Sequence, residues 1–210
     1  MEHGNNMRII TQVLEKAKTL FDVAGFDRTG KATLLVLGLE STTGRNLDDF
    51  GHEDGKFRMY GFEKHVQHRL DELMLFIYDA GYTAEAVGQI GYPLKGEIKL
   101  KEAAIRIGIG KRGKNTVVLH PEYGPRLRFM GIITDLPYNV PDIGFKEEEN
   151  PVCRYCNICI DSCPVNALEP YRMPDPKICL SYITPRTEDG RSILCDLCLK
   201  LCPAGKSEIS

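Results

Sequence analysis

Two segments in the N-terminal part of the chain space their apolar residues as a helix does. Residues 8–21 and 62–80 place an apolar side chain every three or four positions, and Gly81 ends the second segment. A shorter segment, 98–107, has a similar pattern. The pattern predicts a helix at each of these three places. The apolar positions of the two longer helices are Ile10, Val13, Leu14, Ala17, Leu20, Phe21, Val66, Leu70, Leu73, Met74 and Ile77.

Apolar runs bounded by turn residues predict strands between these helices. The continuous run 32–39 is typical of a buried strand, and 83–90, 116–120 and 127–134 favour further strands. Residues 41–60 are rich in Gly, Asp and Thr and are expected to form a long loop. Because helices and strands alternate, the predicted fold class is α+β with packed layers.

Composition and charge are those of an ordinary globular protein. Of the 210 residues, 42% are hydrophobic and 27% are charged, and the formal net charge of −2 gives no argument for a nucleic-acid partner. No apolar run approaches the ~18 residues of a membrane span, and the polar N-terminus contains no signal-peptide core. We therefore expect a cytoplasmic protein without a membrane partner.

The cysteines divide the chain. All eight lie between Cys153 and Cys202, and the charged stretch 146–151, which ends in proline, is typical of a linker. We expect an α/β domain over residues 1–148 and a second domain, built around the cysteines, over residues 149–210.

The first cysteine run has the spacing of bacterial two-cluster ferredoxins. It is C-x2-C-x2-C-x3-C-P, from Cys153 to Pro164. Three closely spaced thiolates can reach three corners of one cubane. The proline after the fourth cysteine helps to turn that sulfur toward the other cluster.

The second run lacks one cysteine of the repeat. It extends from Cys195 to Pro203, with Ser192 where a further cysteine would stand. Cys179 is the cysteine left to fill the vacancy, and the segment between Cys179 and Cys195 is expected to be a surface loop. Crossed ligation then predicts two [4Fe–4S] clusters, one held by Cys153, Cys156, Cys159 and Cys202, the other by Cys163, Cys179, Cys195 and Cys198.

The cysteine pattern disfavours two other kinds of site. An even number fits a disulfide framework, but nothing indicates secretion, and a reducing cytosol disfavours it. Structural zinc fits isolated C-x2-C pairs, but it does not explain two C-x3-C-P endings.

Residues 108–116 contain a G-x-G-x-x-G pattern and an incomplete phosphate-binding loop. Both patterns need a strand before the loop and a helix after it, and here the order is reversed, so we do not expect nucleotide binding. The glycines and basic side chains still suit an anionic group of a cofactor. A tight turn with a solvated basic rim is the alternative. The predicted cofactor-binding residues are Gly110, Lys111, Gly113, Lys114, Asn115 and Thr116.

Several motifs together carry a resemblance to a known family. They are E-A-A at 102–104, G-K-N-T at 113–116, L-H-P-E-Y-G at 119–124, G-I-I-T-D-L-P at 131–137, C-L-S-Y-I-T at 179–184 and the cysteine runs. In these motifs the chain resembles the epoxyqueuosine reductases and the related reductive dehalogenases. The resemblance implies a nitroreductase-like α/β domain that binds cobalamin, followed by a ferredoxin-like domain with two [4Fe–4S] clusters. Thr134 and Asp135 would lie near the corrin, together with the glycine loop.

The resemblance also implies an activity. The protein would be an iron–sulfur oxidoreductase that takes electrons from a ferredoxin or flavodoxin and passes them through the clusters to a cobalamin-dependent reductive site. The family's proton-donating acid has no counterpart here, which leaves Tyr92 as the candidate donor. The family's tRNA-gripping C-terminal repeat is not in the chain, so a tRNA substrate is not expected. A complete corrinoid cleft would need a partner or a second copy, as in a homodimer.

The alternative is a non-catalytic, ferredoxin-like electron-transfer subunit that docks a partner enzyme. The basic glycine loop argues against it, because a pure electron carrier has no need of such a loop. A third interpretation, an RNA-binding module, rests only on the basic stretch 99–128, which has no pattern of aromatic stacking residues. The sequence does not identify the substrate.

Overall fold

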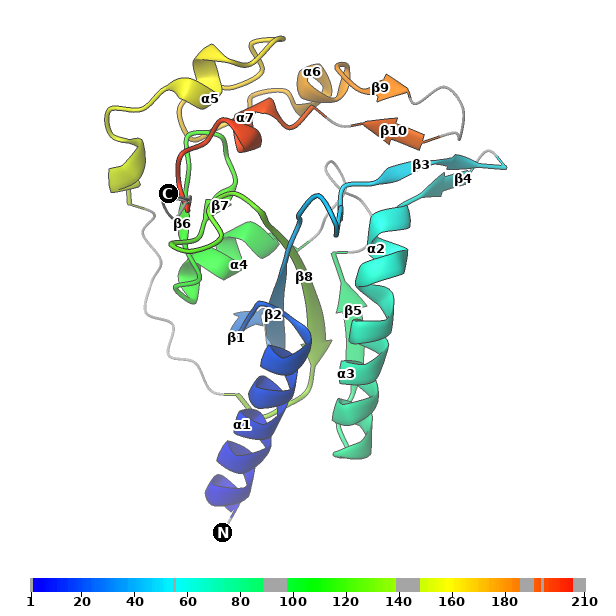
Figure 1. Ribbon diagram of the computed structural model, residues 1–210. Coiled ribbons are helices and arrows are strands. Elements are labelled where there is room, and N and C mark those ends of the chain that lie inside the picture. The colour runs from blue at the N-terminus through cyan, green and yellow to red at the C-terminus, as the bar shows by residue number, and fades with distance from the viewer. Residues whose placement is uncertain are drawn as a thin grey trace. The chain divides into compact units, whose positions relative to one another are not determined.

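The chain folds as two compact units, each assembled from separate stretches of sequence (Figure 1). The computed structural model describes residues 2–54, 56–88, 98–138, 148–185, 191–193 and 195–205. The first unit comprises Met1–Leu39, Val66–Ile109 and Arg128–Lys146, and the second comprises Glu40–His65, Gly110–Leu127 and Glu147–Ser210. The eight cysteines therefore share the second unit with two stretches from the N-terminal part of the chain.

The first unit is built on a four-stranded sheet with the order β1-β2-β8-β5. These strands are β1 (Val23–Thr29), β2 (Ala32–Glu40), β8 (Leu127–Thr134) and β5 (Ala84–Val87). β1 and β2 form an antiparallel hairpin, and β5 pairs antiparallel with β8. Residues 33–39 of β2 are all buried, which confirms the strand predicted from the continuous apolar run.

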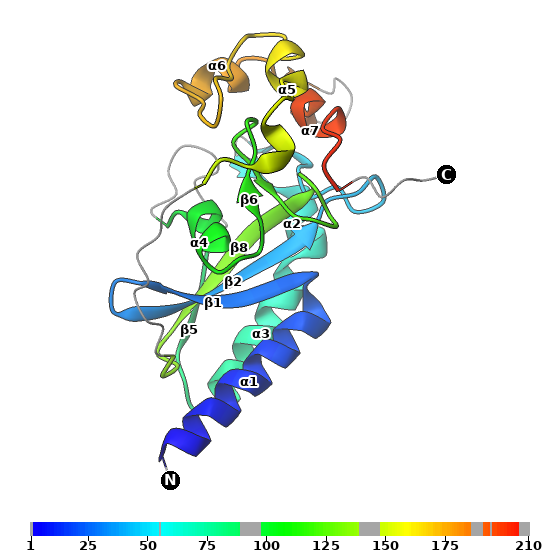
Figure 2. The ribbon, with the colours of Figure 1, turned by 90° about the vertical axis from the view of Figure 1, so that its left-hand side faces the viewer.

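Helices α1 (Glu2–Leu20), α3 (Gln67–Asp79) and α4 (Leu100–Arg106) complete the first unit. α1 and α3 pack together on one side of the sheet, and α4 lies on the other side (Figure 2). The helical spacing seen in the sequence is confirmed by the side chains that these helices bury. From α1 and α3 they are Ile10, Val13, Ala17, Leu70, Leu73 and Ile77.

The second unit contains a small sheet with the order β4-β3-β10-β9. Its strands are β3 (Phe50–Glu53), β4 (Lys56–Arg58), β9 (Thr184–Pro185) and β10 (Arg191–Ile193), and all of its pairings are antiparallel. The β3–β4 hairpin lies within 41–60, so the prediction of a long loop there is wrong for residues 50–53 and 56–58. The prediction of a surface loop between Cys179 and Cys195 is also wrong for residues 184–185 and 191–193, because they form strands.

The remaining elements of the second unit are short. They are α2 (Tyr60–His65), the β6 (Lys111–Arg112) and β7 (Val118–Leu119) hairpin, the 3-10 helix η1 (Pro151–Cys153), and α5 (Ile158–Asp161), α6 (Pro176–Leu180) and α7 (Leu197–Lys200). The single helix predicted over 62–80 is divided at Val66 into α2 and α3, which belong to different units. None of the helices in the described part of the chain is long and apolar enough to cross a membrane.

Candidate metal centre

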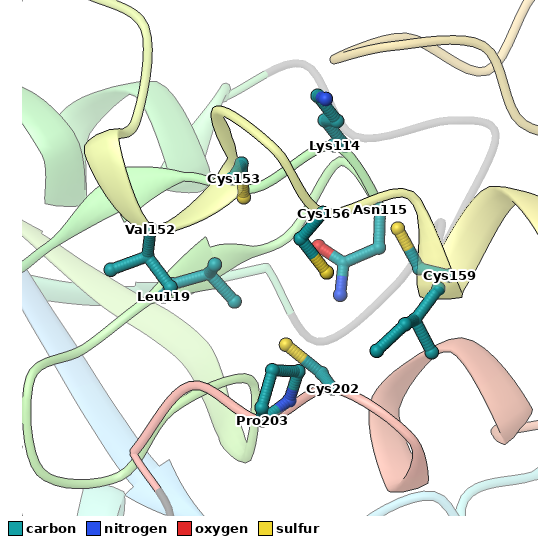
Figure 3. Close-up of a pocket in the computed structure, with 10 residues that line it drawn as sticks. Lys114, Asn115, Leu119, Val152, Cys153, Cys156, Cys159, Cys202 and Pro203 are labelled. Carbon is teal, nitrogen blue, oxygen red and sulfur yellow. The ribbon is translucent and has the colours of Figure 1, made fainter.

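One pocket of the second unit gathers four cysteines from opposite ends of the cysteine-bearing segment. Cys153, Cys156 and Cys159 line it together with Cys202 (Figure 3). Its other lining residues are Lys114, Asn115, Leu119, Val152, Ile158 and Pro203. The four cysteines are the set that crossed ligation assigns to one cluster, and the neighbouring side chains are mostly apolar.

Burial and mutual repulsion disfavour the thiolate form of Cys159 in this pocket when no metal is bound. Burial first, and then the nearby sulfurs of Cys202, Cys153 and Cys156, raise the pKa of the Cys159 thiol to about 11. Several thiolates brought together in a half-buried site need a cationic group between them. Metal ions and iron–sulfur clusters supply such positive charge.

A second group of cysteines interacts in the same way. The pKa of Cys198 is raised to about 12, first by burial and then by Cys179, Cys195, Cys159 and Cys163 in that order. The pKa of Cys179 is also raised, first by burial and then by Cys163 and Cys195. Cys179 therefore lies close enough to three members of the other predicted set to interact with their charges.

The two cysteine runs fold alike although one cysteine differs between them. In each run a short helix starts just after a residue with φ near −120°, Asn157 before α5 and Asp196 before α7. The carbonyl of Asn157 accepts from the amides three and four residues later, and so does that of Asp196. Cys159 and Cys198 therefore occupy equivalent positions. By this equivalence Ser192 stands at the position in the second run that Cys153 occupies in the first.

Two capping motifs hold the ligand-bearing turns, and neither was singled out from the sequence. The side chain of Asn150 accepts from Val152 N at 3.1 Å, with Pro151 at the start of η1. The side chain of Asp175 accepts from Lys177 N at 2.9 Å, with Pro176 at the start of α6. An Asx residue followed by proline is a recognised helix-start signal, and here it precedes Cys153 and Cys179 by three or four residues.

The segment 110–127 packs against both ends of the cysteine-bearing segment. Leu119 packs with Cys153 and Ala204 in a small buried cluster. The turn 120–124 is closed by hydrogen bonds in both directions between His120 and Gly124. Gly124 lies so close to Ala204 that an added Cβ would be 2.0 Å from its carbonyl oxygen. This contact holds the chain two residues beyond Cys202.

The donor set fits an iron–sulfur cluster. It consists of thiols in a largely apolar setting, and the polar neighbours Lys114 and Asn115 are themselves hydrogen-bonded. Within the described ranges, no three His, Cys, Asp or Glu side chains converge on a point where a single metal ion could bind.

The glycine loop turns its central polar side chains into the second unit. Lys114 Nζ donates to Asn157 Oδ1 at 2.9 Å, and Asn115 Nδ2 donates to the carbonyl of Cys198 at 3.1 Å. Both residues are buried. Lys111, by contrast, is exposed and pairs with Glu148 at 3.2 Å. The loop therefore touches a turn of each cysteine run.

The other predicted site residues are placed as follows. Gly110 and Gly113 lie where an added Cβ would collide with Leu119 or Asn115, so these glycines permit close packing within the unit. Thr116 has a positive φ of 68°. Thr134 and Asp135 belong to the first unit. Thr134 Oγ1 accepts from Leu136 N at 3.2 Å, and Asp135 Oδ1 accepts from Thr83 N at 2.7 Å. Tyr92 lies outside the described residues.

Comparison with curated proteins confirms the resemblance found in the sequence. The chain is 37% identical to an epoxyqueuosine reductase of Listeria monocytogenes over 118 residues, which cover 51% of this chain and 30% of that protein. It is 27% identical to an epoxyqueuosine reductase of Cellulophaga algicola over 202 residues, or 85% of this chain and 62% of that protein. A tetrachloroethene reductive dehalogenase of Desulfitobacterium hafniense is 29% identical over 123 residues, or 56% of this chain and 20% of that one. No protein-family model matches the chain.

Solved structures agree on the fold. A crystal structure of epoxyqueuosine reductase matches 96% of this chain and 67% of its own length, with a TM-score of 0.66 and 18% identity. A reductive dehalogenase structure, described as suggesting a mechanism for B12-dependent dehalogenation, matches 84% of this chain and 26% of its own length with a TM-score of 0.57 and 18% identity. The curated relatives with the strongest matches align over about a third of their length, so the chain shares a part of these proteins.

Proposed function

We propose that this chain, a relative of the epoxyqueuosine reductases, is an iron–sulfur reductase whose two [4Fe–4S] clusters deliver electrons one at a time to a reductive site. The observation that carries the proposal is the pocket where Cys153, Cys156 and Cys159 meet Cys202. Cysteines 43 or more residues away in sequence come together there in the combination that crossed ligation requires. The relatives are named as reductases, which favours this function over a separate electron-transfer subunit.

In this proposal the capped turns, the 120–124 turn and the apolar side chains of the pocket each support the cluster ligands. The capped turns before Cys153 and Cys179 set the direction of these ligands, and the 120–124 turn fixes the segment that follows Cys202. The apolar side chains around the pocket exclude water from the cluster, which influences its reduction potential. A low-potential one-electron carrier such as ferredoxin or flavodoxin is the proposed electron donor.

Cobalamin is the proposed acceptor of these electrons. When bound, it supplies a cobalt centre that can be reduced in one-electron steps and can act on the substrate. The residues expected from the sequence to contact it are Gly110 to Thr116, Thr134 and Asp135. Because Lys114 and Asn115 are buried against the cysteine turns, Lys111 is the basic side chain of this loop that is exposed and could meet an anionic group of the cofactor.

Anaerobic purification with cobalamin supplied tests the proposal. If the chain is the proposed reductase, the purified protein should show iron–sulfur absorbance together with corrin bands in a stoichiometric amount relative to the protein. A Cys202→Ser variant serves as a control, because it should lose iron–sulfur absorbance without a direct effect on a corrinoid site. Full iron–sulfur absorbance with no corrinoid bound would contradict the cobalamin part of the proposal. It would instead favour an electron-transfer subunit.

A further inference from the structure

Lys114 is a buried cation whose contacts are all neutral. Its residue is 8% exposed, and its Nζ donates to Asn157 Oδ1 at 2.9 Å and to the carbonyl oxygen of Arg154 at 3.5 Å. Among the residues that the structure describes, no carboxylate lies within 4.0 Å of this nitrogen. Lys111, three residues earlier in the same loop, is exposed and has Glu148 as its partner. The two lysines therefore differ in burial and in the charge that faces them.

Both acceptors of Lys114 belong to the turn that carries three cysteines of one predicted cluster. Arg154 follows Cys153 directly, and Asn157 lies between Cys156 and Cys159. Lys114 also lines the pocket formed by these cysteines, and its amino end is directed away from their sulfur atoms toward Asn157 and Arg154 (Figure 3). The ammonium group is thus fixed to the ligand turn by two hydrogen bonds, and its position follows the position of the cluster ligands.

A buried charge is costly unless an opposite charge or several hydrogen bonds compensate for it. Four thiolates around an oxidised cubane leave a net charge of about −2 in the pocket that Lys114 lines. We propose that Lys114 is the counter-cation of the cluster held by Cys153, Cys156, Cys159 and Cys202, and that it raises the reduction potential of this cluster. The inference rests on the proposed iron–sulfur function and adds a residue that tunes it.

The sign of the effect follows from charge. Reduction adds one electron to the cluster, supplied by the low-potential one-electron carrier, and no covalent bond forms or breaks. The reduced cluster is more negative by one charge, so a fixed cation stabilises it more than the oxidised cluster. Removal of the cation must therefore lower the midpoint potential. The Lys111 charge is exposed, paired and screened by solvent, so its removal should have little effect.

A different role is open to a lysine in a glycine-rich loop, namely contact with the phosphate of an organic cofactor. Such a contact would have to draw Nζ away from Asn157 and Arg154, whose oxygens already accept its protons. The geometry therefore favours the cluster over a cofactor phosphate as the negative charge that Lys114 compensates. The two roles predict different outcomes for the same variant.

The test is a redox titration of the holo-protein, followed by electron paramagnetic resonance, for the wild type, Lys114→Met and Lys111→Met. We expect Lys114→Met to retain iron and sulfide and to lower one of two midpoint potentials. The shift should be at least about tenfold in the ratio of reduced to oxidised cluster, or about 59 mV for a one-electron couple. Lys111→Met should leave both potentials in place.

Lys114→Gln removes the charge and keeps a hydrogen-bond donor toward Asn157. It therefore tests the effect of the charge if Lys114→Met fails to assemble its clusters. A lowered potential in Lys114→Gln supports the inference. Unchanged potentials in a Lys114→Gln protein with full iron content overturn it, whether or not corrinoid retention falls. A wild-type protein without iron and sulfide would instead refute the proposed function itself, so the two failures can be told apart.

Discussion

Gly124 offers a sharp test of how the chain after Cys202 is held. Its φ of +54° lies in the left-handed region, which a residue with a Cβ rarely adopts. A Cβ at this position would be 2.0 Å from the carbonyl oxygen of Ala204 and 2.8 Å from its carbonyl carbon. Because both atoms are backbone, the Gly124→Ala change must displace the segment that follows Cys202.

The cost of Gly124→Ala has two parts. The left-handed backbone costs about 1–2 kcal/mol for a residue with a Cβ. Relief of the overlap requires a movement of about 1 Å, and forced overpacking of this kind costs about 1–3 kcal/mol. Gly30 provides the matched control, because its φ is +58° and an added Cβ would have no atom within 4 Å. Gly30→Ala should therefore show the first part alone.

The assay is iron and sulfide content after anaerobic purification, together with the midpoint of thermal unfolding. Gly124→Ala should lose up to half of the iron, because only the cluster that uses Cys202 is disturbed, and it should unfold at a lower temperature than Gly30→Ala. Gly30→Ala should keep its full iron. If the two variants have the same iron content and the same unfolding midpoint, the contact with Ala204 does not hold the ligand segment and the reasoning is refuted.

Three further changes have defined outcomes. Cys179→Ser should remove about half of the iron, and full iron retention would exclude Cys179 as a ligand. Arg191→Ala removes an ion pair with Asp49 at 2.8 Å and a guanidinium 5.1 Å from the Tyr60 ring, together worth about 1 kcal/mol. It should speed iron loss to a chelator about fivefold, unlike Arg172→Ala, whose partner Glu169 is only three residues away. Burial lowers the pKa of His120 below 6.5, and its neutral Nδ1 accepts hydrogen bonds from two backbone amides. The contribution of His120 to folding stability is therefore fully present above pH 6.5 and is lost as the pH falls through the lowered pKa. Unfolding midpoints at pH values from about 7.5 to 5 check this against His120→Asn, which should show a smaller dependence; equal dependences would contradict it.

The elements that the sequence predicted well depend on local pattern. α1 and α3 follow from apolar positions at helical spacing, and β2 follows from an uninterrupted apolar run. The cysteine runs are equally local, because their spacing is read within a few residues and the short helices α5 and α7 carry Cys159 and Cys198. These features need no knowledge of which distant segment packs against them.

The elements that the sequence missed depend on distant partners. β3 pairs with its neighbour β4 and, through Phe50 and Gly51, with the distant strand β10, and none of these stretches has an apolar run long enough to predict a strand by itself. The break at Val66 also escaped prediction, because apolar spacing continues through it while the two halves join different units.

The glycine loop shows the same limit at the candidate site. Its glycines and basic residues are local features, and they indicate an anion. What each lysine contacts depends on burial, and Lys114 is buried against a segment 40 residues further along the chain. The side chain of Lys114 contacts the first cysteine turn, whereas that of Lys111 pairs with Glu148, although the sequence alone treats the two alike.

The central claim, that the eight cysteines hold two [4Fe–4S] clusters, is tested most directly by metal and sulfide analysis of protein purified without oxygen. The account predicts about eight iron and eight acid-labile sulfide per chain, with zinc absent. One or two zinc ions per chain without sulfide would contradict it, as would disulfide bonds among these cysteines.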